Sequence, residues 1–445
     1  MKYDLIIIGA GPGGYETAVA AAKAGLQVAI VEKNALGGTC LNVGCIPTKC
    51  LCRNAEFLLD LAQADAFGVE AGPAAFDLAK AIDRKDAVVE QLRGGVEVLL
   101  AQPGITRFEG KAYFRDAHAV GIEGSDEVLE APNIIIATGS ETKFLPIEGA
   151  HHPRVLTSTE MLSLRQLPKS LAVIGGGVIG MEFASIFNAF GTHVSVLEYC
   201  KEILPFFDRD MAKRLRTALK KRGIEFHVGA AVCGVRDSEN ALADVLFEEK
   251  GAQASLEAEV VLMAVGRAAN VGSLNLADVG IATERRGITT DDNLQTSVPG
   301  IYAIGDVNGR IQLAHAATFQ GKRALNHILG RPDQLQIDLC PAAVFTTPEL
   351  AMVGQTEEQL KADGTDYRAE KAFYRANGKA LAMGEGEGIV KLLVAPDDRL
   401  LGAHILGAHA ADLIHEATLL MQLGGTLSQM RQTIHAHPSL SELFV

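Results

Sequence analysis

The stretch YDLIIIGAGPGG, residues 3–14, decides the fold of the first part of this 445-residue chain. Its apolar run, residues 3–8, has the length of a buried strand and leads directly into a cluster of glycines. An alanine-rich helical stretch over residues 15–25 and a second apolar strand over residues 27–31 follow. Strand, glycine turn, helix and strand in this order predict a βαβ unit that binds a dinucleotide.

Each glycine of this turn has a separate task in such a unit. Gly9 permits the tight turn, Gly11 lets the backbone approach a pyrophosphate, and Gly14 lets the helix pack closely on the strand. Glu32 lies 23 residues after Gly9, at the end of the second strand. A carboxylate at that point accepts a hydrogen bond from a ribose hydroxyl.

The same order of elements returns in the middle of the chain. A strand over residues 170–174 leads into a glycine loop and a helix, and a strand over residues 193–197 ends at Glu198, again 23 residues after the first glycine of its loop. The glycines of this second loop that match the first are Gly175, Gly177 and Gly180. Repetition of a whole unit predicts two nucleotide sites, one for FAD and one for a nicotinamide dinucleotide.

The rest of the chain indicates how these units are arranged into domains. Apolar strands over residues 260–265 and 300–304 each end in a glycine turn, whereas residues 54–66 have a helical pattern and residues 388–394 read as an alternating strand. We therefore predict an α/β fold with two Rossmann-like dinucleotide-binding domains and a C-terminal α+β domain. The predicted boundaries are residues 1–145 and 266–332 for the FAD-binding domain, 146–265 for the NAD-binding domain, and 333–445 for the C-terminal domain.

Two cysteines lie in the segment GGTCLNVGCIPTK, residues 37–49, shortly after the second strand. On an ideal helix the Cα atoms of Cys40 and Cys45 would be about 8–9 Å apart, beyond the limit of about 7 Å for a disulfide. A disulfide here needs a distorted turn, which Gly44 permits, and such a short-loop bridge is expected to be reactive. Two buried apolar cysteines are the alternative, and the spacing of the cysteines at 40, 45, 50 and 52 disfavours a structural zinc site.

The C-terminal segment HAHPSLSE, residues 435–442, contains two histidines and a carboxylate. A dithiol must lose a proton before it attacks a disulfide, and a histidine such as His437 is the usual acceptor near neutral pH. Glu442, five residues later, is placed to orient the imidazole. A solvated tail histidine and a metal-binding His-x-His pair are the alternatives, but the sequence offers no evident third metal ligand, so we predict no metal site.

The composition of the chain limits the classes of binding partner and the cellular compartment that we expect. With 41 basic and 54 acidic residues the formal charge is −13, which is not typical of a nucleic-acid-binding surface, and the basic run over residues 214–222 reads as a solvated helix face. No apolar run approaches the length of about 20 residues that a membrane span needs, and the N-terminus leads directly into a strand. We expect a cytoplasmic protein, in which a disulfide is more often catalytic than structural.

Along its whole length the chain resembles the pyridine nucleotide-disulfide oxidoreductases. Residues 37–49 are similar to the redox motif of that family, and residues 302–306 to the segment whose aspartate, here Asp306, binds the ribityl chain of FAD. Residues 264–267, 313–315 and 341–356 also resemble family segments. Besides the glycine loops, the resemblance implies flavin contacts from Lys49, Thr138, Gly139, Asp306 and Ala314, and a contact to NAD from Gly266.

The ending HAHP, residues 435–438, resembles the dihydrolipoyl dehydrogenase branch of the family more than glutathione or mercuric reductases. That resemblance implies that Cys40 exchanges with the substrate and Cys45 lies beside the flavin. It implies an ion pair between Lys49 and Glu182 next to the isoalloxazine, with His437 and Glu442 as the base pair. The implied reaction is oxidation of dihydrolipoyl groups with reduction of NAD⁺.

The resemblance also implies partners. In such relatives the base reaches across a homodimer, so we expect a homodimer built on residues after about 335, and a lipoyl-bearing domain of a 2-oxo acid dehydrogenase or glycine cleavage complex as a partner. Glu198 favours NAD over NADP because a carboxylate repels a 2′-phosphate, although Lys201 lies nearby.

Three features depart from the family pattern and leave other functions open. Cys50 and Cys52 stand where relatives carry small or apolar residues, and are read either as inert helix cysteines or as an added thiol relay. Gln320 replaces a frequent glutamate, which is expected to alter the nicotinamide side of the flavin. Only three residues follow Glu442, and this short ending is expected to affect the strength of the dimer more than the chemistry. An NAD(P)H-dependent reductase of another disulfide is the alternative enzyme, and a flavin redox sensor is a third reading.

Overall fold

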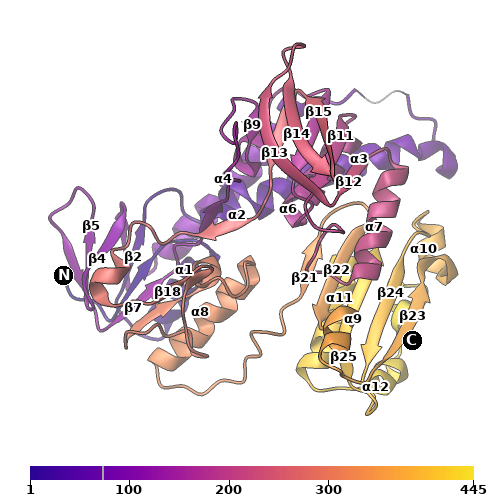
Figure 1. The fold of residues 1–445 in the computed structure, drawn as a ribbon. Coiled ribbons are helices and arrows are strands. Elements are labelled where there is room, and N and C mark those ends of the chain that lie inside the picture. The colour runs from indigo at the N-terminus through magenta and orange to yellow at the C-terminus, as the bar shows by residue number, and fades with distance from the viewer. Residues whose placement is uncertain (73–74) are drawn as a thin grey trace. The chain divides into compact units, whose positions relative to one another are not determined.

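The computed structural model describes residues 1–72 and 75–445, which form two compact units (Figure 1). The first unit contains Met1–Cys50, Ile82–Lys143 and Gly266–Ile337. The second contains Leu51–Ala81, Phe144–Val265 and Asp338–Val445. No helix within the described ranges is both long enough and apolar enough to cross a membrane.

A five-stranded parallel sheet forms the centre of the first unit, in the order β20-β7-β1-β2-β3. Along β1, Ile6 and Ile8 belong to the core on one face, and Leu5 and Ile7 to the core on the other. The run of residues 5–8 is apolar at every position because both faces of the sheet are covered. The strands are β1 (Leu5–Ile8), β2 (Val28–Glu32), β3 (Ile105–Glu109), β7 (Asn133–Ile136) and β20 (Ile301–Ala303).

Helices and small sheets complete the first unit. Helix α1 packs so closely on α8 that a Cβ atom at Gly13 would lie 3.0 Å from the Ala317 carbonyl oxygen. The helices are α1 (Pro12–Lys23), α2 (Gly38–Val43), the beginning of α3 (Cys45–Ala62), most of α4 (Leu78–Leu100) and α8 (Ala314–Ile328), with 3₁₀ turns η2 (Leu276–Val279) and η3 (Gly305–Asn308). The smaller strands are β4 (Ala112–Asp116), β5 (Ala119–Ile122), β6 (Val128–Glu130), β8 (Ser140–Thr142), β17 (Arg267–Ala269), β18 (Thr283–Glu284) and β19 (Gly287–Ile288).

The second unit repeats this topology in its own parallel sheet, in the order β12-β11-β10-β16-β9. In both sheets the strand before the glycine loop is central and pairs with the strand that ends in a glutamate, which confirms the predicted repeat. The parallel strands are β9 (Val155–Leu156), β10 (Ser170–Ile174), β11 (His193–Glu198), β12 (Glu225–Val228) and β16 (Val260–Met263). Around them lie α5 (Ser158–Met161), α6 (Val178–Ala189), α7 (Arg209–Lys221), and the antiparallel strands β13 (Ala230–Asp237), β14 (Ala243–Glu249) and β15 (Ala252–Ala258).

The C-terminal part of the second unit is an antiparallel sheet in the order β21-β22-β25-β24-β23, with helices beside it (Figure 1). Its core includes apolar residues of the sheet, of α11 and of the last turn η5. The strands are β21 (Ala342–Val344), β22 (Glu349–Gly354), β23 (Arg368–Phe373), β24 (Ile389–Val394) and β25 (Leu400–Gly407). The helices are α9 (Glu357–Ala362), α10 (Gly378–Ala382), α11 (Ala410–Gln422) and α12 (Leu427–Gln432), and the turns are η4 (Tyr374–Ala376) and η5 (Leu440–Phe444).

Two sequence-based predictions were wrong in detail. Strand β24 does not alternate: every residue of Ile389–Val394 is buried, including Lys391, because the strand lies inside the sheet with both faces covered. The helix predicted over residues 54–66 begins much earlier, at Cys45, and ends at Ala62. The long helix therefore starts inside the cysteine motif rather than after it.

Candidate active site

Cys40 and Cys45 form a disulfide at the junction of two helices. Cys40 lies in α2, Cys45 is the first residue of α3, and Gly44 separates the helices with φ −144° and ψ −112°. This break brings the two Cα atoms to 4.6 Å, within the range that a disulfide requires. The predicted distorted turn is confirmed, and a Cβ atom at Gly44 would lie 2.8 Å from the Thr39 carbonyl oxygen, so glycine permits the close approach.

The start of α3 also favours one direction of disulfide cleavage. The N-terminus of an α-helix carries a partial positive charge from its unpaired backbone N–H groups. Cys45 occupies that position in a helix of 18 residues. A negative charge on the Cys45 sulfur is therefore stabilised by the fold itself, as in other reactive cysteines at helix N-termini.

The two glycine loops have nearly the same geometry. Gly9 and Gly175 have φ +105° and +109°, in the region that favours glycine. A Cβ atom at Gly14 would lie 1.9 Å from the Gly9 carbonyl oxygen, and one at Gly180 would lie 2.0 Å from that of Gly175. Each loop therefore depends on glycine at its first and last positions, as predicted.

The middle glycines keep the helix N-termini open. Gly11 precedes α1 and Gly177 precedes α6. A Cβ atom at Gly177 would meet nothing within 4 Å, and one at Gly11 would meet only the Gly38 Cα atom at 3.9 Å. Backbone N–H groups at an open helix N-terminus form an anion site, so both loops fit the pyrophosphate of a dinucleotide.

Glu32 and Glu198 are held alike at the ends of β2 and β11. Glu32 accepts hydrogen bonds from the backbone N–H groups of Ala10 (2.7 Å) and Asn34 (2.8 Å). Glu198 accepts from those of Gly176 (2.5 Å) and Cys200 (2.6 Å). A carboxylate has about four acceptor sites, so each glutamate retains capacity for a ribose hydroxyl.

Asp306 lies in a polar network formed by residues that are far apart in the sequence. The Ser140 hydroxyl donates to Asp306 Oδ2 at 2.5 Å, and Arg267 Nε donates to the Ser140 hydroxyl at 2.6 Å. Arg267 Nε also lies 3.9 Å from Asp306 Oδ2. Burial is the main reason that the pKa of Arg267 lies below its usual value. Asp306 is thus oriented by neighbours on β8 and β17.

Gln320 holds the turn that carries Asp306. Its side chain is buried, and its Oε1 accepts hydrogen bonds from the backbone N–H of Gly305 (2.7 Å) and from Asn308 Nδ2 (2.8 Å). Asn308 Nδ2 also donates to the Ala303 carbonyl oxygen at 3.0 Å. The Gln320 amide oxygen therefore accepts the hydrogen bonds that a glutamate carboxylate would accept here, without placing a charge in the interior.

Four further predicted contact residues lie in turns or at a helix end of the first unit. The Thr138 hydroxyl donates to the Asn270 carbonyl oxygen at 2.9 Å, Gly139 has φ +68°, and the Gly266 carbonyl oxygen accepts from the Lys143 backbone N–H at 3.0 Å. Ala314 begins α8, where unpaired N–H groups favour negative charge. Their contacts with FAD or NAD stay predictions.

The predicted ion pair of Lys49 and Glu182 also stays a prediction. Lys49 lies in α3, and Glu182 lies in α6 with 4% of its surface exposed. Glu182 Oε1 accepts a hydrogen bond from the Phe345 backbone N–H at 3.0 Å. This contact joins α6 to the segment after β21 and fixes the orientation of the carboxylate.

His437 and Glu442 lie together at the end of the chain. His437 Nδ1 is 2.9 Å from Glu442 Oε1, while Glu442 Oε2 accepts from the Ser439 backbone N–H at 2.8 Å. The Ser439 contact, followed by that of His437, lowers the pKa of Glu442. The His437 side chain is 80% exposed, so Nε2 is accessible to a dithiol. The geometry is that of a base held by an ionised carboxylate.

The neighbouring histidine has a different environment. His435 Nε2 is 2.6 Å from Glu416 Oε1, and Nδ1 is 2.8 Å from the Thr433 carbonyl oxygen, with only 7% of the side chain exposed. Burial is the largest single influence and would lower the pKa of His435, but the hydrogen bonds to Glu416 and Thr433 and the nearby carboxylates together outweigh it and raise the pKa. With acceptors at both nitrogens, His435 is suited to a structural role, which leaves His437 as the candidate base.

The two extra cysteines are buried in α3. Cys50 is 9% exposed and Cys52 is 6% exposed, and the Cys52 thiol donates to the Phe345 carbonyl oxygen over 3.3 Å. Reactive cysteines require access and a positive environment. The burial favours the reading of inert helix cysteines over that of a thiol relay.

The chain matches two protein-family models. Residues 3–321 match the pyridine nucleotide-disulphide oxidoreductases, and residues 340–445 match the dimerisation domain of that family. The second match covers the antiparallel sheet with α11 and α12.

Individual relatives agree with these matches. A dihydrolipoyl dehydrogenase of Bacillus subtilis is 42% identical over 448 residues, covering 100% of this chain and 95% of that protein. The dihydrolipoyl dehydrogenase of Geobacillus stearothermophilus is 41% identical, again with 100% and 95% coverage. Among solved structures, the HOCl-induced flavoprotein disulfide reductase RclA from Escherichia coli superimposes with a TM-score of 0.89 at 34% identity, covering 99% of both chains.

Proposed function

The chain belongs to the pyridine nucleotide-disulphide oxidoreductase family, and from this premise we propose that it oxidises dihydrolipoyl groups to lipoyl disulfides with reduction of NAD⁺. Membership makes it a flavin disulfide oxidoreductase that binds FAD and a pyridine nucleotide, with Cys40–Cys45 as its redox disulfide. The observation that carries the choice of a dithiol substrate is the exposed His437 imidazole held by Glu442, because a dithiol needs a base before it can attack.

The proposed cycle begins with proton transfer from one substrate thiol to His437. The thiolate attacks Cys40 Sγ, the bond between Cys40 and Cys45 breaks, and Cys45 leaves as a thiolate at the start of α3. The second substrate thiol attacks the sulfur attached to Cys40, which closes the lipoyl disulfide, and its proton goes to the Cys40 sulfur. The two electrons of the substrate now reside in the cysteine pair.

Bound FAD would supply the redox chemistry that connects the reduced cysteine pair to NAD⁺. Gly9, Gly11 and Gly14 with Glu32 and Asp306 bind FAD in this scheme, supported by the open start of α1 and by the orientation of both carboxylates. Thr138, Gly139 and Ala314 add contacts, and Lys49 with Glu182 forms the ion pair that sets the electric field beside the flavin.

The second glycine loop binds NAD in preference to NADP. Gly175 and Gly177 precede α6 and Gly180 lies in its first turn, and Gly266 is proposed as a further contact to NAD. Glu198 supports the preference because its carboxylate is fixed at the end of β11 and would repel a 2′-phosphate.

The proposed assembly is a homodimer formed through the dimerisation domain. In it, His437 of one subunit serves the disulfide of the other, and a lipoyl-bearing domain of a 2-oxo acid dehydrogenase or glycine cleavage complex brings the substrate. In this proposal, the FAD-binding domain consists of residues 1–145 and 266–332, the NAD-binding domain of residues 146–265, and the dimerisation domain of residues 333–445. The proposed compartment is the cytoplasm.

Reduction of another disulfide by NAD(P)H is the second candidate function. The 0.89 TM-score to the disulfide reductase RclA favours it, because the same machinery runs in either direction. A redox sensor that reports through Cys50 and Cys52 is disfavoured by the burial of both side chains.

An anaerobic titration of the FAD-loaded protein tests the proposal. Dihydrolipoamide is expected to bleach and shift the flavin spectrum and to support rapid formation of NADH. Cys40→Ser is expected to abolish this turnover while FAD stays bound, and Cys50→Ser, at a buried cysteine directly after the redox motif, is the control that retains it. Inert dihydrolipoamide combined with NADH-driven reduction of another disulfide would establish the second candidate instead.

A further inference from the structure

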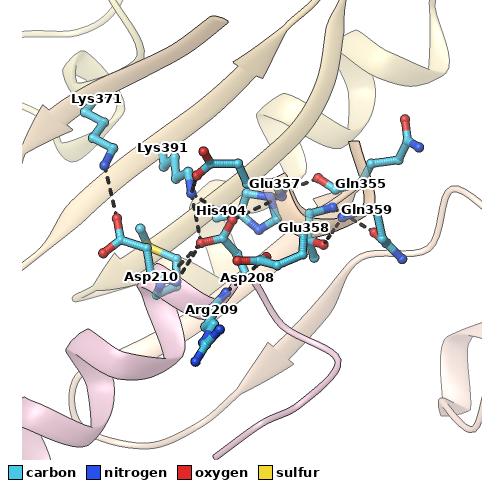
Figure 2. A network of polar contacts seen from close by, with 12 residues as sticks. Asp208, Arg209, Asp210, Gln355, Glu357, Glu358, Gln359, Lys371, Lys391 and His404 are labelled. Carbon is cyan, nitrogen blue, oxygen red and sulfur yellow. Dashed lines mark hydrogen bonds and ion pairs between the residues drawn. The ribbon is translucent and has the colours of Figure 1, made fainter. Parts of the chain in front are cut away.

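Lys391 lies in the middle of β24 with none of its side chain exposed. Its Nζ donates to Asp208 Oδ1 and Oδ2 at 3.0 and 2.8 Å and to Glu357 Oε2 at 2.5 Å (Figure 2). Burial alone would lower the pKa of Lys391, but the hydrogen bonds to the two carboxylates outweigh it and raise the pKa. The ammonium group is therefore charged, and its three N–H bonds all meet carboxylate oxygens.

Basic side chains form a row across the C-terminal antiparallel sheet, on the strands β23, β24 and β25. Lys371 on β23 pairs with Lys391 on β24, which pairs with His404 on β25. Like charges directly opposite one another destabilise a sheet, but each lysine meets its own aspartate: Lys391 contacts Asp208, and Lys371 Nζ is 3.1 Å from Asp210 Oδ2 (Figure 2). Burial lowers the pKa of His404 to about 4, so this ring adds no charge at neutral pH.

Asp208 joins two helix starts to Lys391. It is the N-cap of α7, where Oδ1 accepts from the backbone N–H groups of Asp210 (3.1 Å) and Met211 (3.3 Å). Its Oδ2 accepts from the backbone N–H of Glu357, the first residue of α9, at 3.3 Å. Asp208 has no exposed surface, so its position is determined by these contacts.

The segment before Asp208 contacts the second glycine loop. Residues 199–207 connect Glu198, at the end of β11, to Asp208. Within this segment the Leu204 backbone N–H donates to the Gly176 carbonyl oxygen at 2.9 Å, and Leu204 is buried at φ +49°. The segment is therefore held at Leu204 by the second glycine loop and at its C-terminal end by the buried cluster.

We propose that Lys391 is a positioning residue for the pyridine nucleotide, although it does not touch that ligand. By holding Asp208, it fixes the segment 199–207, which braces Gly176 and the carboxylate of Glu198. The inference rests on the proposed function only in assigning the second glycine loop to a pyridine nucleotide.

Lys391→Met removes the tether and keeps the volume of the side chain, while Asp208 retains its three backbone donors. Lys371→Met is the matched control, because it deletes the same charge from the neighbouring strand and breaks a contact to the same helix, at a side chain that is 37% exposed. Both are made in the FAD-loaded protein. The dissociation constant of NADH and the rate of flavin reduction by dihydrolipoamide are measured.

We expect Lys391→Met to weaken NADH binding at least tenfold while flavin reduction by dihydrolipoamide stays within twofold of the unaltered protein. Lys371→Met is expected to leave both within twofold. Equal NADH affinity in the two variants, or an equal loss of flavin reduction and NADH binding in Lys391→Met, would overturn the positioning role. Failure of the unaltered protein to oxidise dihydrolipoamide would refute the proposed function instead, because NADH binding is measured without that substrate.

The double variant Asp208→Asn, Lys391→Met separates positioning from stability. Asparagine caps a helix as well as aspartate, and the pair removes the uncompensated buried carboxylate. It is expected to melt at a higher temperature than Lys391→Met and still to bind NADH at least tenfold more weakly than the unaltered protein. Recovery of NADH affinity together with thermal stability would refute the inference, and this variant carries the test if the single variant does not fold.

Discussion

Replacement of Gln320 by leucine is expected to destabilise the turn Gly305–Asn308, which carries Asp306, and thereby to weaken FAD binding. The side chain is 1% exposed, and its Oε1 is the acceptor for two donors, the Gly305 backbone N–H and Asn308 Nδ2. Leucine fills a similar volume but accepts neither bond. Asn308 keeps its contact with the Ala303 carbonyl oxygen, whereas the N–H of Gly305 is left without this acceptor.

The size of the effect follows from the donor that loses its partner. A buried unsatisfied donor costs about 1–3 kcal/mol, so the loss of the acceptor for the Gly305 N–H is expected to lower the free energy of unfolding by about 1–3 kcal/mol. The turn Gly305–Asn308 carries Asp306. Because FAD binding must then reorder the turn, the dissociation constant of FAD rises about tenfold for each 1.4 kcal/mol that this reordering costs.

Denaturant unfolding of the FAD-free protein measures the loss of stability. The rate of FAD release from the loaded protein measures the weaker binding of FAD. Lys322→Leu, at an exposed position of the same helix, is the control and is expected to change neither. Gln320→Glu keeps the acceptor and is expected to retain more FAD affinity than the leucine variant. A leucine variant with the unfolding midpoint and FAD release rate of the unaltered protein would refute the reasoning.

Three further outcomes are expected. Gly44→Ala places a Cβ atom 2.8 Å from the Thr39 carbonyl oxygen, so a thiol count should find the Cys40–Cys45 bridge incompletely formed; full oxidation and activity would contradict this. Glu442→Gln should lower dihydrolipoamide turnover by about 10²-fold, on the order of the contribution of a general base, with FAD content unchanged; undiminished turnover would remove Glu442 from the mechanism. Hydrogen bonds from Lys361 and Lys391 lower the pKa of Glu357 from 4.5 to about 2, so its stabilisation is present above pH 4.5 and is lost as the pH falls towards 2. Glu357→Gln should flatten the fall in stability over that range in acid unfolding curves, and an unchanged slope would count against the ion pair.

The local chemistry of glycine made much of the site predictable. A glycine loop, its strand and its helix are contiguous, so the sequence contains every group that decides the backbone there, and both loops have the predicted geometry. The same holds for Gly44, where the spacing of Cys40 and Cys45 demanded a break that the structure contains. The pairing of His437 with Glu442 was also predictable from the sequence, because Glu442 follows His437 by only five positions.

Contacts between distant segments were not predictable in this way. Ser140, Arg267 and Asp306 meet only after β8 and β17 pair. The sequence contains a signal for the buried cluster, a lysine inside the apolar run over residues 388–394, but nothing local to that run identifies its partners Asp208 and Glu357.

The two βαβ units, the cysteine turn and the family follow from the sequence, because they depend on glycine positions, hydrophobic runs and spacings within about 30 residues. The tertiary structure alone decided that His435 is the buried partner of Glu416 while His437 remains exposed, and that Lys391 is neutralised by Asp208, 183 residues away. Burial and charge compensation are properties of the packed chain. A side chain acquires them only when segments that are remote in sequence enclose it.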